Sequence, residues 1–378
     1  MLAQTFIWAL MAGVAFSKTC YNVTVPVPVT ARNGDFGGLQ TPQTNLEANM
    51  FALAAIQQGS NGTEKALTGY KTISGHYNIS AEYCVPSNTR DNAPLQILTH
   101  GIGFDKTYWN LPFNNYNYSY VDYALSRGYH TFAYDRLGIG NSSHGDPKNE
   151  IQTALEVESL MQITRRIRNG TIAEIRKKPS KIIHVGHSFG SVQTYVLTDK
   201  YPDLSDGIVL TGYALNATFM PYFLAGSTLQ QAKSGPNGQN YKPGYLSAGT
   251  LANTEYAFFN PGNFDPEILE FGDKIKQPVT VGELLTIGSI PKQSKFSGPV
   301  LIISGSNDLP FCGGNCLATG GTAKSIPAAA KVAFPSAKTF SAVIQPQTGH
   351  GLNLHYNATG GYKQIADFLD HNVLFEKH

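Results

Sequence analysis

Charged residues are scarce in this 378-residue sequence: Lys, Arg, Asp and Glu make up 14% of it and leave a net charge of +2. A chain so close to neutral lacks the basic surface that nucleic-acid binding needs. Beyond the N-terminal segment no apolar run is long enough to span a membrane, and no pattern indicates a metal or an organic cofactor. Hydrophobic residues are abundant, at 42%, which is enough for one large core.

The one long apolar run stands at the N-terminus, from Leu2 to Phe16. Ala15 and Ser17 supply small residues at the spacing that precedes a cleavage site, so we predict a signal peptide over residues 1–17 and a mature chain that starts at Lys18. A signal anchor is the alternative, although the run is short for a membrane span. The predicted localisation is therefore extracellular, without stable membrane insertion.

N-x-S/T sequons agree with secretion, because such acceptors are glycosylated in secreted proteins. The glycosylation candidates are Asn22, Asn61, Asn78, Asn117, Asn169, Asn216 and Asn357. We expect an eighth sequon, at Asn141, to be unmodified because it lies in a loop beside the candidate site described below.

The four cysteines all follow the predicted cleavage site and allow three pairings. Cys312 and Cys316 are close neighbours in a Gly-rich turn, and Cys20 and Cys84 each border a strand-like run near the N-terminus. We therefore favour the disulfides Cys20–Cys84 and Cys312–Cys316. The alternative, a four-cysteine zinc site, requires closely spaced pairs of ligands, and Cys20 and Cys84 are far apart in sequence.

Strands alternate with helices through most of the chain. Residues 21–31 and 75–85 alternate polar with apolar residues, which predicts two antiparallel strands, and residues 44–60 predict a helix with Thr44 as its N-cap. Further strands are predicted at residues 95–99, 130–134, 181–185, 207–211, 300–304 and 339–344, with helices at residues 151–169, after Ser188 and at residues 361–375. This alternation predicts an α/β fold with a mainly parallel sheet covered by helices on both faces.

The stretch between the strands at residues 207–211 and 300–304 interrupts this pattern and is much longer than an ordinary connection. We interpret residues 217–296 as a lid inserted after the sixth strand, into a core formed by residues 18–216 and 297–378. Two aromatic clusters in the lid could contact an apolar substrate or simply pack the lid onto the sheet; they comprise Phe219, Tyr222, Phe223, Tyr256, Phe258 and Phe259.

Ser188 lies between the strand at residues 181–185 and a helix, in the G-x-S-x-G motif GHSFG. Glycines at 186 and 190 permit the close backbone approach of a sharp turn that exposes the serine. Because serine is a weak nucleophile, it needs a base and an acid that orients the base, and in this architecture they follow in the order acid, then histidine. Asp308 and His350 each follow a predicted strand in that order.

Other residues near the motif receive supporting roles. His355 is the competing base, whereas His184 and His187 are too close to Ser188 in sequence and are expected to be packing residues. Developing oxyanion charge needs N–H donors, and we expect those of Phe189 and of Ile102, with Gly103 as the alternative to Ile102.

The loop that follows the strand at residues 95–99 also carries Tyr108 and Trp109, which we expect to line a substrate pocket. Residues 44–60 could form a second wall at its mouth. Asp135 and Arg136 are expected to brace the neighbouring loop through an ion pair.

Five motifs, HGIGFD, YDRLGIGNSS, GHSFG, GSND and GHGLNL, together resemble the α/β-hydrolase superfamily, and more narrowly its secreted fungal esterase- and lipase-like members. The resemblance runs from about residue 70 to the C-terminus. It implies that Ser188 is the nucleophile, His350 the base and Asp308 the orienting acid, with the amides of Ile102 and Phe189 as the oxyanion hole. HGIG departs from the HGGG of some lipases, and a serine at 188 departs from epoxide hydrolases and dehalogenases, whose nucleophile is aspartate.

The predicted function is hydrolysis of a small apolar carboxylic ester by a secreted serine hydrolase through an acyl-enzyme. A lactonase, an amidase or proline-type peptidase, and a carbon–carbon bond hydrolase are alternatives that use the same three residues. A non-catalytic binding protein of the same fold is a further alternative, which loss of a triad residue would support; none is lost.

Overall fold

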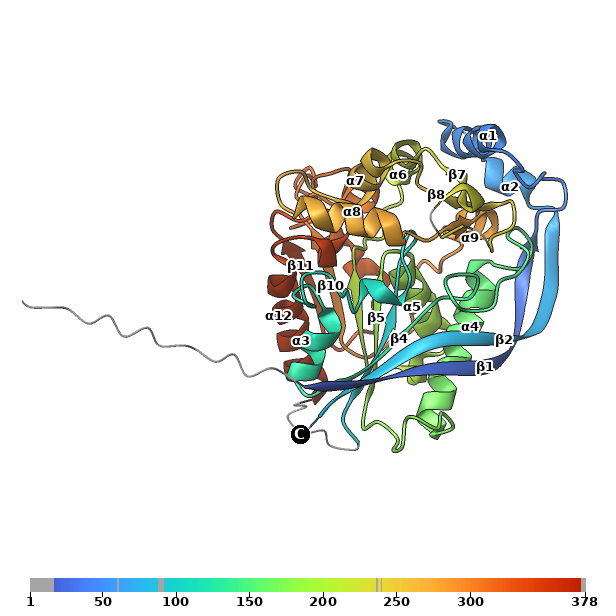
Figure 1. Ribbon diagram of the computed structural model, residues 1–378. Helices are drawn as coiled ribbons and strands as arrows, with labels where there is room; N and C mark the ends of the chain where they lie inside the picture. Colours follow the sequence, from blue (N-terminus) through green and yellow to red (C-terminus); the bar gives the residue numbers. More distant parts are fainter. Residues whose placement is uncertain (1–16, 60, 88–91, 236, 239, 375–378) are drawn as a thin grey trace, which may run out of the picture.

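The protein is described by a computed structural model that covers residues 17–59, 61–87, 92–235, 237–238 and 240–374. An eight-stranded sheet runs through it in the order β1-β2-β4-β3-β5-β6-β10-β11 (Figure 1). The strands are β1 (Lys18–Asp35), β2 (Gly69–Pro86), β3 (Leu95–Thr99), β4 (His130–Tyr134), β5 (Ile182–His187), β6 (Gly207–Thr211), β10 (Val300–Gly305) and β11 (Phe340–Gln345). From β4 to β11 neighbouring strands are parallel, whereas β1 and β2 pair antiparallel with each other and β2 with β4.

Helices cover both faces of this sheet, as the alternation of strands and helices predicts. On one side α3 packs against β2, β4 and α12, and on the other α4 packs against β1 and α5. Every residue of β3 to β6 is buried, which matches short apolar strands covered from both sides. The helices of the core are α3 (Tyr120–Ser126), α4 (Thr153–Asn169), α5 (Phe189–Lys200), α10 (Leu309–Cys312), α11 (Ile326–Ala329) and α12 (Ala358–Leu369).

The N-terminal strands are antiparallel as predicted, and longer than their alternating patterns. Their pairing runs from Lys18 opposite Pro86 to Asp35 opposite Gly69. The connection between them holds α1 (Asn45–Ile56) and α2 (Gly62–Ala66), which lie at one end of the long hairpin (Figure 1). Thr44 caps α1 as expected, because its hydroxyl accepts the amide of Glu47 while the Glu47 carboxylate accepts the amide of Thr44.

The chain between β6 and β10 forms a separate layer beside the sheet, in agreement with an insertion after the sixth strand (Figure 1). Its elements are α6 (Met220–Ser227), β7 (Gln230–Gln231), β8 (Tyr245–Ser247), α7 (Leu251–Phe258), α8 (Pro266–Ile275), β9 (Val279–Thr280) and α9 (Val281–Thr286). The three short strands make a second sheet in the order β7-β8-β9. At α9 the insertion is tied to the core, because the Gly282 amide donates to the Pro147 carbonyl at 2.7 Å.

Both favoured disulfides are present. Cys20 and Cys84 stand directly opposite each other in the pairing of β1 with β2, and Cys312 is joined to Cys316 four residues later. Since all four cysteines are disulfide-bonded, the zinc alternative is wrong.

Residues 1–16 of the predicted signal peptide lie outside the described residues, as does Phe375, the last residue of the predicted C-terminal helix. The first strand begins at Lys18, the predicted start of the mature chain. In the described part of the chain no helix combines the length and the apolarity of a membrane span. Of the sequon asparagines, Asn216 and Asn357 are half-buried and the others, Asn141 included, are exposed, so which of them carry glycan stays a prediction.

Candidate active site

Ser188 stands on a sharp turn between β5 and α5. Its φ of 53° lies in the left-handed region, which a residue with a side chain adopts only when its surroundings impose it. A Cβ on Gly186 would lie 2.4 Å from the Gly190 carbonyl oxygen, and one on Gly190 would lie 2.1 Å from the Thr99 carbonyl oxygen. Neither position can therefore carry a side chain, and this close backbone approach is what the G-x-S-x-G pattern predicted.

The structure brings the three predicted residues of the triad together at the carboxyl ends of the parallel strands. The Ser188 hydroxyl lies 2.8 Å from His350 Nε2, and His350 Nδ1 lies 2.7 Å from Asp308 Oδ2. In a neutral imidazole this arrangement makes Nδ1–H the donor to the carboxylate and leaves Nε2 to accept the serine hydroxyl. All three side chains are buried, so water does not compete strongly for these contacts.

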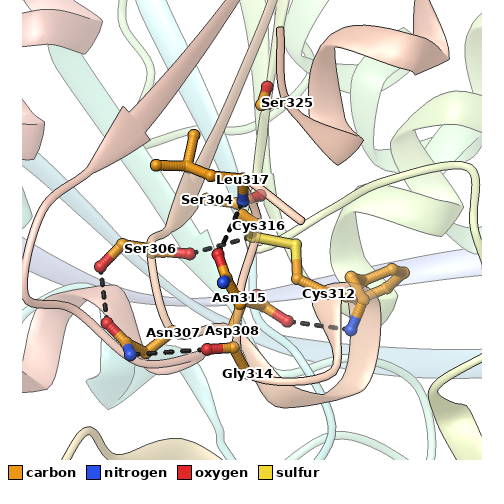
Figure 2. The surroundings of a disulfide bond; sticks show 12 residues. Ser304, Ser306, Asn307, Asp308, Cys312, Gly314, Asn315, Cys316, Leu317 and Ser325 are labelled. Carbon is orange, nitrogen blue, oxygen red and sulfur yellow. Dashed lines mark hydrogen bonds between the residues drawn. A yellow bond between two sulfur atoms is a disulfide. The ribbon is translucent and has the colours of Figure 1, made fainter. Parts of the chain in front are cut away.

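The Asp308 carboxylate is held by the loop that follows β10. Its Oδ1 accepts the Phe311 amide at 2.9 Å, which makes Asp308 the N-cap of the one-turn helix α10 (Figure 2). That helix ends at Cys312, whose disulfide to Cys316 closes the turn, and the Cys316 amide donates to the Ser306 carbonyl at 2.9 Å (Figure 2). The other carboxylate oxygen is thereby left pointing at His350.

His355, the competing base, braces the loop that carries His350. Its Nε2 accepts the amides of Gly349 and Asn260 at 3.0 and 2.9 Å, and its Nδ1 donates to the Gly351 carbonyl at 2.9 Å. Burial lowers the pKa of His355 to about 4, which fits a neutral ring with both nitrogens in use. The geometry thus favours His350 as the base.

The candidate oxyanion donors flank Ser188. Phe189 is the first residue of α5, and an amide at that position has no acceptor inside its helix. Ile102 lines the same cavity as Ser188 and His350, and a Cβ on Gly101 would lie 2.9 Å from the Ser188 Cβ. The loop therefore comes close enough to the serine to present a donor.

His100, to which the sequence assigned no role of its own, orients this loop. Its Nε2 accepts the Arg136 amide at 3.0 Å, which leaves Nδ1–H to donate to the Gly101 carbonyl at 2.9 Å. Carbonyl and N–H of one trans peptide point in opposite directions, so this bond directs the Ile102 amide away from His100. Burial, followed by the charge of Arg136, holds the pKa of His100 well below its usual range.

Asp135 and Arg136 form ion pairs, but with other partners than each other. Asp135 Oδ2 accepts from Lys106 Nζ at 2.7 Å, and its Oδ1 accepts the Lys106 amide at 3.0 Å, so it does brace the loop after β3. Arg136 is fully buried; its guanidinium pairs with Glu156 on α4 at 2.6 Å and with Glu283 on α9. These two adjacent residues after β4 thus have different roles: Asp135 holds the loop after β3, and Arg136 links the inserted layer to the core.

The two histidines near Ser188 in sequence, His184 and His187, are buried and packed in the core, as expected. His184 is fully buried between the hydroxyls of Thr164 and Ser205, each 2.9 Å away, and burial lowers its pKa to about 3. His187 stacks on Tyr108 with ring centroids 4.5 Å apart, and burial, then the charge of His350, keeps its pKa well below the usual range. Neither ring takes the place of His350 beside Ser188.

A cavity of about 430 Å³ opens beside Ser188 and His350. The core loops contribute Ile102 and Pro310, and the rest of the wall comes from two other parts of the chain. The inserted layer supplies Ala217, Met220, Phe223, Leu224, Leu284, Leu285, Ile287, Gly288 and Ser289, and the N-terminal connection supplies Ala55, Thr63, Glu64 and Leu67. The hypothesis that residues 44–60 contribute a wall holds for Ala55, while α2 and Leu67 contribute more.

Tyr108 and Trp109 do not line this cavity, so the prediction that they would do so is wrong. The chain makes a short 3₁₀ turn at Lys106–Tyr108, capped by Asp105, which sends both rings into the core with 1% exposure each. The Tyr108 carbonyl accepts the amide side chain of Asn353 at 3.0 Å there. Both side chains therefore pack in the core and support the loop after β3.

Of the six lid aromatics only Phe223 lines the cavity that holds Ser188. Phe258 instead stacks over His350, with ring centroids 6.1 Å apart and an interplanar angle of 19°. Phe259 packs on Phe264, so Phe223 faces the cavity beside Ser188 whereas Phe259 packs within the inserted layer.

Comparison with known proteins agrees with this architecture. Residues 96–359 match the model of the alpha/beta hydrolase family. The chain belongs to that family. No curated protein matches the sequence.

Solved structures share the fold at low sequence identity. A thermophilic esterase from Thermogutta terrifontis, solved with malate bound, is 15% identical over 79% of this chain and 94% of its own, with a TM-score of 0.53. An enol-lactonase from Burkholderia xenovorans LB400 is 16% identical over 78% of this hydrolase and 96% of its own chain, with a TM-score of 0.50. An alpha/beta hydrolase fold protein from Chitinophaga pinensis is also 16% identical, over 78% and 94%, with a TM-score of 0.50.

Proposed function

We propose that this hydrolase is a secreted serine esterase that cleaves carboxylic esters with an apolar acyl group through an acyl-enzyme. The observation that carries the proposal is the continuous hydrogen-bonded chain from Ser188 Oγ through His350 to Asp308, at 2.8 and 2.7 Å, at the base of a largely apolar cavity. A serine in this setting has a base within reach, and the base has a partner that fixes its tautomer.

Catalysis would begin with attack of Ser188 Oγ on the ester carbonyl carbon while His350 Nε2 takes the hydroxyl proton. The amides of Ile102 and Phe189 would then donate to the oxyanion of the tetrahedral intermediate, where loss of one donor lowers the rate by roughly 10²–10³-fold. As the intermediate collapses, His350 returns the proton to the departing alcohol. A water molecule, deprotonated by His350, attacks the acyl-enzyme and releases the acid with Ser188 restored.

The imidazolium formed in each half of the cycle is stabilised by Asp308, which is fully buried and already aligned with Nδ1. The second carboxylate oxygen stays engaged by the Phe311 amide, so the carboxylate need not reorient when charge develops. Such preorganisation in a site with little water is the main source of electrostatic stabilisation in enzymes.

An apolar acyl group suits the cavity because most of its wall is aliphatic or aromatic. Glu64 is the one carboxylate among the described lining residues, and with Thr63 it is exposed, at the solvent side of the N-terminal wall. Neutral esters would therefore enter more readily than anionic ones.

Secretion rests on the N-terminal apolar segment and the sequons, and it accords with two disulfides, which persist in oxidising compartments. Intact-mass analysis of protein from the culture medium, before and after enzymatic deglycosylation, tests this part: a chain that starts at Lys18 and loses mass on deglycosylation is expected.

The activity is tested by labelling the purified protein with a fluorophosphonate and locating the adduct by mass spectrometry. We expect the adduct on Ser188, no adduct in His350→Ala, and hydrolysis of p-nitrophenyl esters that Ser188→Ala abolishes. Parallel assays with lactones, anilides and β-diketones separate esterase from lactonase, amidase and carbon–carbon hydrolase. A folded protein that is neither labelled nor active would refute the proposal and favour a binding role.

A further inference from the structure

A second, smaller cavity adjoins the catalytic one. It has a volume of about 20 Å³ and lies between the loop after β3 and the inserted layer. Its wall is mainly apolar and includes Phe104, Leu229, Leu246, Phe258, Val279 and Leu354. Two residues, Ile102 and Phe223, line both this cavity and the one that holds Ser188.

Phe223 is held firmly in this position. It lies on α6, which packs against α1, α7 and α10, and its side chain is 6% exposed. Its ring meets Phe258 nearly edge to face, with centroids 5.8 Å apart and an interplanar angle of 71°. Phe258 in turn fills the space in front of Gly103, where a Cβ would lie 2.8 Å from its Cζ.

Of the two shared residues, Ile102 belongs to the loop that offers the oxyanion donor, so its side chain is tied to the reacting carbonyl. Phe223 belongs to the inserted layer and supplies no group to the triad or the donor pair, and its ring packs on Phe258, which stacks over His350. A substrate bound with its carbonyl oxygen at the Ile102 amide would have its acyl chain begin beside the Ile102 side chain, next to the ring of Phe223.

We propose that Phe223 is a specificity-determining residue that limits the length of the acyl chain by closing the passage from the catalytic cavity to the smaller apolar cavity. This inference rests on the proposed esterase function and names the part of the substrate that Phe223 selects. A smaller residue at 223 would join the two cavities and let a longer acyl chain extend toward Leu229 and Leu246.

The test measures kcat/KM for p-nitrophenyl esters of straight-chain acids of increasing length, using the wild-type protein, Phe223→Ala and Phe223→Leu. Leu224→Ala is the matched control, because Leu224 lines the catalytic cavity but not the smaller one. A second series, acetates of alcohols of increasing length, distinguishes the acyl from the alcohol side. Circular dichroism and thermal melts show which variants are folded, and Phe223→Leu provides the milder change if Phe223→Ala is unstable.

We expect Phe223→Ala to shift the optimum to longer acyl chains, with a gain of roughly fourfold in kcat/KM for each additional buried methylene, chiefly through KM. The readout is the ratio of kcat/KM for each longer ester to that for the acetate, which removes any general effect passed to His350 through Phe258. This ratio should rise in Phe223→Ala and not in Leu224→Ala, and the alcohol series should show no such rise. A Phe223 residue that only packs the lid would lower stability without moving the optimum, and that result would overturn the proposal. So would a shift confined to the alcohol series. Absence of wild-type esterase activity would instead refute the proposed function on which the inference depends.

Discussion

Removing the Cys312–Cys316 disulfide should impair catalysis, whereas removing the Cys20–Cys84 disulfide should not. The bond closes the turn that begins at Asp308, the residue that orients His350 (Figure 2). Without the disulfide, the Asp308 carboxylate still accepts the Phe311 amide as the N-cap of α10, and the Gly314 amide still donates to the Asp308 carbonyl at 2.9 Å. The turn would therefore loosen rather than unfold, in the region where alignment with His350 matters most.

Loop length sets the effect of each disulfide on stability, because a crosslink mainly restricts the unfolded chain. Cys312 and Cys316 are 4 residues apart, which gives a stabilisation of about 2 kcal/mol, whereas the separation of 64 between Cys20 and Cys84 gives about 4 kcal/mol. Misplacing a catalytic group by about 1 Å lowers a rate by roughly 100-fold, so partial loosening at Asp308 should lower kcat about tenfold. The Cys20–Cys84 disulfide lies far from Ser188, because Cys84 pairs with Thr131 near the amino end of β4, whereas Ser188 follows the carboxyl end of β5.

The double variants Cys312→Ala/Cys316→Ala and Cys20→Ala/Cys84→Ala should therefore differ in both kcat and the size of the stability loss. Urea unfolding measures the loss of stability, and kcat for a short p-nitrophenyl ester, measured where both variants are fully folded, reports alignment. We expect the first variant to lose about tenfold in kcat and about 2 kcal/mol of stability, and the second to lose about 4 kcal/mol of stability and little activity. Full kcat without the Cys312–Cys316 bond would refute its role in positioning Asp308, and equal stability losses would contradict the argument from loop length.

Three further predictions follow from the buried polar groups. Asp308→Asn should keep the fold but lower kcat roughly 10⁴-fold, since an amide favours the wrong tautomer of the histidine; steady-state kinetics and circular dichroism check both halves. Arg136→Met should lower the free energy of unfolding by about 3–5 kcal/mol, because it leaves the carboxylates of Glu156 and Glu283 buried without their cation, and replacing both with Leu as well should restore much of it in urea titrations. Burial lowers the pKa of His355 to about 4 in the folded state, below the 6.5 of the unfolded chain. The unfolded chain thus binds the extra proton, so about 3 kcal/mol of stability present above pH 6.5 should be lost as the pH falls toward 4, and His355→Gln should flatten that pH dependence.

The sequence predicted the parts of the fold that depend on local pattern. The parallel strands were recognisable because each is a short apolar run between turns, and all residues of β3 to β6 are indeed buried. The turn at Ser188 was predictable because Gly186 and Gly190 leave no room for a Cβ. Asp308 and His350 were found by their order and their place after strands, and the structure brings them to Ser188.

Partners that lie far apart in the sequence were not predictable in the same way. Arg136 and Glu283 are separated by 147 residues, and no local pattern says that a strand end and a lid helix meet. Tyr108 and Trp109 closely follow the candidate oxyanion loop, which suggested a pocket, but in the structure both side chains are buried in the core at the 3₁₀ turn Lys106–Tyr108. His100 could have been suspected from the HG pair, although its bond to the Arg136 amide depends on the sheet bringing β3 beside β4.

The cavity wall is built by two different parts of the chain, the core loops and the segments outside the core, and this explains why a similar fold says little about the substrate. The proposed reacting groups, Ser188 and Asp308 among them, lie on core loops whose backbone is constrained by the sheet. Nearly all of the remaining wall comes from α1, α2, α6 and α9 and the segments beside them, outside the parallel core. These segments can change in length and side chain without altering the loops that carry Ser188, His350 and Asp308, so we expect substrate preference to depend mainly on them. Phe223 is such a residue: it lies on α6 and lines the cavity, but it supplies no reacting group. We therefore expect substitutions at Phe223 to change the preferred substrate with a small effect on kcat for short esters.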